Sequence, residues 1–149
     1  MDKITATAIA NLQRLADTFA ERRRQLAAGI DLTEAQWRVL AEVGDEDFLP
    51  SLFARRRSIT PAAVSRTLRQ LLERDLVKSG IGAKDGRQRR YQLTAKGVKA
   101  LEEVAAARAA AVAEVWAEIP KRDLATFSRV SGELAERLVR YTEAVGSKP

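Results

Sequence analysis

The sequence predicts a mainly α-helical fold with one small β-hairpin. Hydrophobic residues make up 46% of the 149 residues and aromatic residues only 5%, which favours an aliphatic, largely helical core. Larger apolar residues recur at intervals of three or four over most of the chain, as on one face of a helix. Residues 76–94 are the exception, because two short, partly alternating segments there flank a turn-like stretch with two glycines.

Two helices are expected in the first part of the chain. Apolar residues from Ile4 to about Leu26 mark the first helix, and Gly29 is its predicted C-terminal stop. The second helix should run from about Glu34 to Val43, behind an N-cap at Thr33 with a glutamine at the third helical position. Its inward-facing residues are expected to be Trp37, Leu40 and Val43.

A short helix over about residues 48–56 and a longer helix are expected next. The longer helix should begin at Pro61, because proline suits the first helical position, with Thr60 as its N-cap. Its predicted inward face is apolar and consists of Val64, Leu68, Leu71 and Leu72. The residues predicted to point away from that face are small or basic: Ala62, Ser65, Arg66 and Arg69.

Two long helices should close the chain. Thr94 is expected to cap the first, and Pro120 should end it and start the second. The first carries an apolar stripe of Leu101, Val104, Val112, Val115 and Ile119. The second carries apolar residues at near-heptad intervals: Leu124, Phe127, Leu134, Leu138, Tyr141 and Val145.

The net charge of +6 is concentrated in the middle of the chain. Positions 55–90 hold eleven basic and three acidic residues, a local balance of +8, so the rest of the chain carries −2. Such asymmetry indicates a polyanionic partner for this segment, with a solvated basic surface as the alternative interpretation.

Composition argues against several classes of function. The chain has no cysteine, so it can form neither a disulfide nor a thiolate site. It also has no histidine, which is the commonest metal ligand and the commonest general base in proteins. The adjacent Glu102 and Glu103 point to different faces of a helix and cannot act jointly. We therefore expect no enzyme activity, metal site or cofactor. Since neither a signal peptide nor an apolar run long enough to cross a bilayer is found, a cytoplasmic location without membrane association is expected.

The short helix, the tight turn and the second helix have the spacing of a helix-turn-helix. Small residues such as Ala62 would let the second helix enter a DNA major groove. Ser65 can bond a phosphate or base edge, and the planar forks of Arg66 and Arg69 suit guanine or phosphate oxygens. The free N–H groups after Thr60 would add an anion site.

The hairpin that follows predicts a wing. Lys84 and Arg87 lie at its tip, where they could reach a minor groove, and Asp85 would orient an arginine by a salt bridge. The full set of predicted DNA-binding residues is Thr60, Ala62, Ser65, Arg66, Arg69, Lys84, Asp85, Arg87 and Arg89.

The segments "ITPAAVSRTLRQLLERDLV" and "KDGRQRRYQLTAKGVKAL" resemble the helix-turn-helix and wing of MarR-type transcriptional regulators, and "LTEAQWRVLAEV" resembles the preceding helix. The residues that match the wing pattern of that family are Asp85, Arg87, Leu93, Thr94 and Gly97. The resemblance implies that Ala62, Ser65, Arg66 and Arg69 read the major groove and that Arg87 reads the minor groove. Asp75 departs from the pattern, since the family usually has glycine there, and Ser79 stands where arginine is frequent.

The terminal helices predict self-association. We expect one chain, 1–149, with a winged helix-turn-helix lobe at 33–94 and a helical dimerisation region at 1–28 and 95–146. The apolar stripes exceed what a small winged core can bury, and a two-fold dimer would place two recognition helices about 34 Å apart on one DNA face. The resemblance implies the same dimer. The alternative is that the terminal helices cover the winged core of one subunit.

MarR-type proteins commonly bind small, often anionic aromatic effectors between the dimer helices and the DNA-binding lobe. The resemblance therefore implies a candidate effector site, and the inferred layout brings four residues near enough to form it: Phe19, Arg22, Arg23 and Trp37. The alternative is that both aromatic residues belong to the core and both arginines to the surface.

Together these features predict a homodimeric, sequence-specific regulator of transcription that binds double-stranded DNA at a pseudo-palindromic operator and acts as a ligand-responsive repressor. The alternative is a helical protein-interaction module whose basic face does not bind DNA.

Overall fold

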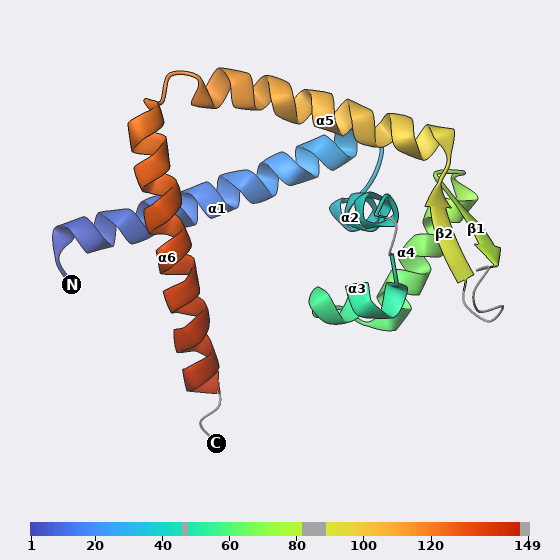
Figure 1. Cartoon of the computed structure of the whole chain (residues 1–149), viewed down its shortest axis with the longest axis horizontal. Coiled ribbons are helices and arrows are strands. Elements are labelled where there is room, and N and C mark those ends of the chain that lie inside the picture. The colour runs from blue at the N-terminus through green and yellow to red at the C-terminus, as the bar shows by residue number, and fades with distance from the viewer. Residues whose placement is uncertain (46–47, 82–88, 147–149) are drawn as a thin grey trace. The chain divides into compact units, whose positions relative to one another are not determined.

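The computed structural model describes residues 1–45, 48–81 and 89–146 (Figure 1). Within them the elements are α1 (Lys3–Gly29), α2 (Glu34–Val43), α3 (Pro50–Arg56), α4 (Pro61–Glu73), β1 (Val77–Ile81), β2 (Arg89–Leu93), α5 (Ala95–Trp116) and α6 (Lys121–Gly146). The predicted fold, mainly helical with one hairpin, is confirmed. The chain divides into two compact units, Met1–Ala109 and Ala110–Pro149, and α5 runs across the boundary between them.

The predicted N-caps are confirmed. The backbone N–H of Gln36 donates to Thr33 Oγ1 at 3.2 Å, and the N–H of Thr33 donates to Gln36 Oε1 at 2.9 Å, which completes a capping box at the start of α2. Thr60 Oγ1 accepts from the N–H of Ala63 at 3.2 Å, with proline in the first turn of α4. The first turn of α5 is capped in the same way by the Thr94 hydroxyl.

The short helix begins two residues later than predicted, at Pro50. The residue before a proline is disfavoured in the helical region, and Leu49 is extended, with φ −119° and ψ 114°. Phe48 lies outside the helix and belongs to the core, where it is 7% exposed.

One hydrophobic core holds α2, α3, α4 and the hairpin together within the unit Met1–Ala109. Leu40 and Leu71 are fully buried, which confirms the predicted inward faces of α2 and α4. Trp37 and Leu72 are only partly buried and pack against this core. The buried members of the core are Leu32, Val39, Leu40, Val43, Phe48, Phe53, Ala54, Val64, Leu68, Leu71, Leu76 and Val77.

The hairpin is antiparallel, with Val77 opposite Leu93 and Ile81 opposite Arg89. Val77 is buried and Leu93 packs against the core, so the base of the hairpin is attached to the lobe. Residues Lys84, Asp85 and Arg87, which were predicted at its tip, lie outside the described residues.

The turn between α4 and β1 explains the departure at position 75. Asp75 has φ +56°, in the left-handed region that glycine adopts most easily and aspartate tolerates better than most residues. Its carbonyl oxygen accepts a hydrogen bond from the Thr94 hydroxyl at 2.7 Å. The helix end that glycine would favour therefore forms with aspartate.

The apolar stripes of the last two helices stay largely exposed. In α6 none of the residues is buried, and Leu138 and Tyr141 are 62% and 69% exposed. Val112 and Val115 of α5 are likewise exposed. Among the described residues, no helix combines the length and apolar character needed to cross a bilayer.

Candidate nucleic-acid interface

The outward face of α4 is the centre of the candidate interface. The residues on it that the sequence predicted, Ala62, Ser65, Arg66 and Arg69, are all exposed. Val64, Leu68 and Leu71 are buried on the opposite face, which confirms the predicted orientation of the helix. Within the described ranges neither Arg66 nor Arg69 forms an ion pair, so both guanidinium groups are available to an external anion.

Polar bridges hold α4 against the elements before it. Gln36 Nε2 of α2 donates to Gln70 Oε1 at 3.0 Å. Arg74, directly after α4, donates to the Asp31 carbonyl oxygen at 2.5 Å and to Asp31 Oδ2 at 2.7 Å. Together with the buried inner face of α4, these bonds fix the position of the helix and leave its outer face exposed to solvent.

The hairpin follows directly from α4 (Figure 1), and its described basic residues are exposed. They are Lys78 on β1 and Arg89 and Arg90 on β2. The structure thus places Arg89, one of the predicted DNA-binding residues, on the surface at the start of β2. Of the nine residues predicted to bind DNA, the six within the described ranges are exposed.

A cluster that the sequence reasoning missed lies at the turn of the helix-turn-helix. Glu42, in the last turn of α2, bonds Arg56 Nη2 at 2.6 Å and lies 3.8 Å from Arg57 Nη2. The Arg57 guanidinium also lies 5.9 Å from the centroid of the Phe53 ring. The run of three arginines at 55–57 is the signal in the sequence, but a run of charge does not indicate which carboxylate pairs with it.

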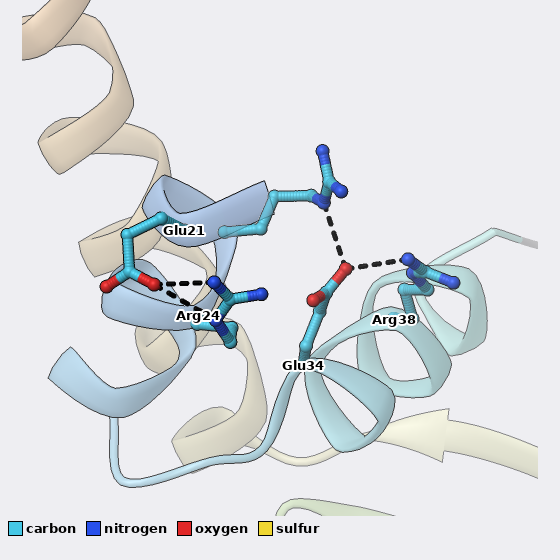
Figure 2. Close-up of polar contacts among 5 residues, drawn as sticks. Glu21, Arg24, Glu34 and Arg38 are labelled. Atoms are coloured by element: carbon cyan, nitrogen blue, oxygen red, sulfur yellow. Dashed lines mark hydrogen bonds and ion pairs between the residues drawn. The ribbon is translucent and has the colours of Figure 1, made fainter. Parts of the chain in front are cut away.

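Both arginines of the predicted effector site, Arg22 and Arg23, form contacts within the unit Met1–Ala109. Arg23 Nε donates to Glu34 Oε1 at 2.9 Å, and Arg38 Nη2 donates to the same oxygen at 2.6 Å (Figure 2). The hydrogen bond from Arg23, with the bond from Arg38, lowers the pKa of Glu34 below its ordinary value. Arg22 is within 3.5 Å of the Ala107 carbonyl oxygen.

A second ion pair lies close by on α1 (Figure 2). Arg24 Nη2 donates to Glu21 Oε2 at 2.6 Å, and this bond lowers the pKa of Glu21. The aromatic members of the predicted effector site differ, because Trp37 packs against the core whereas Phe19 is 48% exposed. Their role in effector binding stays a prediction.

An open cavity of about 760 Å³ lies beside the hairpin, between β2, α3 and the end of α2. Its lining includes Phe48, Leu52 and Tyr91 together with the basic Arg89 and Arg90. None of the four predicted effector residues lines it. Across the described ranges, no three His, Cys, Asp or Glu side chains are grouped so as to hold a metal ion.

Comparison with known proteins identifies the central part of the chain. Residues 30–88 match the model of the MarR family. The transcriptional regulator ZitR of Lactococcus lactis subsp. cremoris is 31% identical over 93 residues, which cover 59% of this chain and 64% of that protein. The match therefore spans a little less than two thirds of the length of this relative.

Solved structures match over nearly the whole chain. The MarR family transcription regulator SP03579 has a TM-score of 0.82 at 15% identity, covering 93% of each chain. MarR of Staphylococcus aureus in complex with salicylate and kanamycin has a TM-score of 0.76 at 19% identity, covering 93% of this chain and 95% of that one. The MepR–DNA complex of S. aureus has a TM-score of 0.67 at 16% identity, covering 85% and 93%. At these identities the likeness establishes a shared fold.

Proposed function

We propose that this chain, whose residues 30–88 match the model of the MarR family, is a member of that family and a regulator of transcription that binds double-stranded DNA as a homodimer. The observation that carries the proposal is the outward face of α4, where Ala62, Ser65, Arg66 and Arg69 are exposed together. Small residues let a helix approach the floor of a major groove, and arginine forks match guanine O6 and N7. The +8 charge of residues 55–90 supplies the attraction to phosphate.

We propose that two parts of the winged lobe, residues 33–94, contact the DNA: the helix α4 and the hairpin. Thr60, Ala62, Ser65, Arg66 and Arg69 would contact the major groove and its phosphates. Lys84, Arg87 and Arg89 would contact the flanking minor groove, with Asp85 orienting an arginine. The MepR–DNA complex, whose protein shares this fold, supports this use of the fold.

The proposed dimer is formed by residues 1–28 and 95–146. The exposed apolar residues of α5 and α6 support it, because a monomer would leave large apolar side chains in water. Two copies related by a two-fold axis would read a pseudo-palindromic operator in successive major grooves. We propose that the dimer represses transcription, because a dimer bound to an operator would exclude other proteins from that DNA. We propose that it does so in the cytoplasm.

We further propose that a small aromatic or anionic effector releases the DNA. Arg22 and Arg23 could neutralise its charge, and Phe19 and Trp37 could contact its ring. The salicylate complex of S. aureus MarR supports this class of ligand. Binding at this site would change the equilibrium between DNA-binding and non-binding arrangements of the dimer. No catalytic step or cofactor is part of the proposal.

Binding of DNA selected by the protein from a random pool, measured over a range of salt concentrations, tests the proposed function. We expect a palindromic consensus and a steep fall of affinity, with a log–log slope of about −0.9 for each phosphate neutralised. An affinity that does not change with salt would contradict DNA binding by the basic face.

Light scattering of the purified protein tests the dimer. The exposed stripes of α5 and α6 predict the mass of two chains at micromolar concentration. A monomer that associates with other helical proteins would instead favour the protein-interaction alternative.

A further inference from the structure

Glu42 is a mostly buried carboxylate that lies beneath two surface arginines. Its side chain is only 14% exposed, whereas the side chains of Arg56 and Arg57 are 54% and 51% exposed. Burying a carboxylate is costly unless it is paired, and both partners of Glu42 come from the end of α3, fourteen and fifteen residues further along the chain. Glu42 thus ties the last turn of α2 to the turn of the helix-turn-helix.

These contacts leave most of the arginine donors free. Each guanidinium carries five N–H donors, and Glu42 takes one hydrogen bond, from Arg56. Arg57 is also restrained by the Phe53 ring at 5.9 Å. Both guanidinium groups are therefore limited in orientation while their outer edges remain in solvent, just before the N-terminus of α4.

We propose that Glu42 is a positioning residue that holds Arg56 and Arg57 ready to bind phosphate groups of the DNA backbone. The inference rests on the proposed DNA-binding function and adds residues that the sequence reasoning did not assign. Arginine is well suited to this role, because its planar fork matches two phosphate oxygens. A side chain that is already oriented loses less conformational freedom when it binds.

Glu42 also has an opposing effect on DNA binding, through its charge. The Glu42 carboxylate also cancels one positive charge near the DNA, and its removal would strengthen attraction to a nearby phosphate by about threefold or less in salt solution. Releasing the two long arginine side chains would weaken binding by about tenfold or more, because each would then lose the freedom of several rotatable bonds when it binds DNA. Positioning therefore outweighs charge, and loss of Glu42 should weaken DNA binding.

The experiment uses the full-length protein and a mixed-sequence duplex of about 30 base pairs, since phosphate contacts do not depend on sequence. The Glu42→Gln variant keeps the shape of the side chain and is expected to bind about fivefold more weakly, with an unchanged salt slope. The double variant Arg56→Ala, Arg57→Ala should reduce the magnitude of the slope by about two. Adding Glu42→Gln to that double variant should cause no further loss of affinity, and removal of the negative charge should raise affinity by about threefold or less.

The chain offers a matched control in Glu34, at the other end of α2. Glu34 also bonds two arginines, Arg23 and Arg38 (Figure 2). Glu34→Gln should leave DNA affinity unchanged. The variant Arg56→Lys, Arg57→Lys leaves Glu42 in place, keeps both charges and removes both forks, so it should weaken binding without changing the slope.

Two results would overturn the inference. One is a Glu42→Gln variant that binds as tightly as the original protein or more tightly. The other is an equal loss when Arg56 and Arg57 are already alanine, which would show that Glu42 acts only through folding. If the unaltered protein binds the duplex and Arg66→Ala weakens that binding, either result leaves the proposed function intact. If the unaltered protein shows no salt-dependent binding, the proposed function fails and this inference fails with it.

Discussion

Replacing Gly97 by alanine is expected to destabilise the chain by about 3 kcal/mol or more. A Cβ atom at this position would overlap the carbonyl oxygen of Leu76 and lie 3.4 Å from the Leu93 side chain. The Leu76 carbonyl cannot easily move, because it accepts the N–H of Thr94 at 3.1 Å where the hairpin joins α5. The first turn of α5 can approach the base of the hairpin only without a side chain at residue 97.

Thermal unfolding measures this effect, and a loss of 3 kcal/mol corresponds to a fall in Tm of about 6–12 °C for a chain of this size. Gly132→Ala is the matched control, because Gly132 lies inside α6 with nothing within 4 Å of its would-be Cβ. Alanine there should stabilise the helix by about 0.5–1 kcal/mol. Equal stability of the Gly97→Ala variant and the original protein would refute the close approach of α5 to Leu76.

The double variant Arg66→Ala, Arg69→Ala is expected to lose at least about 30-fold in affinity for the DNA that the protein selects. Each arginine fork that reads a base contributes about 1–3 kcal/mol, and these two are adjacent on the exposed face of α4. The selectivity for the chosen sequence should fall together with the affinity. The Tm should change little, since both side chains are exposed and form no ion pair among the described residues.

A competition assay against mixed-sequence DNA distinguishes the loss of base-specific contacts from the loss of positive charge. The control is Arg14→Ala, Arg108→Ala, which removes two exposed positive charges from α1 and α5. This control should change affinity only slightly and selectivity not at all. An equal loss in both double variants would mean that the outward face of α4 acts through net charge alone.

Local features of the chain were predictable because their causes are local. The caps at Thr33, Thr60 and Thr94 involve residues three positions away, and helix and strand periodicity follows from successive residues. The pairing of the hairpin followed from its turn sequence and from the alternation on either side. Even the outward face of α4 could be predicted, because its buried residues recur at helical intervals.

Features that depend on distant residues were missed or remain predictions. The pairing of Glu42 with Arg56 joins residues fourteen positions apart in two helices, and no local pattern indicates it. The burial of Phe48 outside α3 depends on its ring contacts with Phe53 and Tyr91. Phe19, Arg22, Arg23 and Trp37 were grouped from an inferred layout, whereas in the structure Arg23 is bonded to Glu34 and Trp37 packs against the core.

The sequence by itself therefore determined the order and type of the elements, the caps, the basic centre and the side of α4 that faces outward. Tertiary structure alone decided which arginines are held in place, why residue 97 must be glycine, and which apolar residues stay exposed. The physical reason is that periodicity and capping act within a few residues of the chain, whereas burial and ion pairing depend on which elements meet in space.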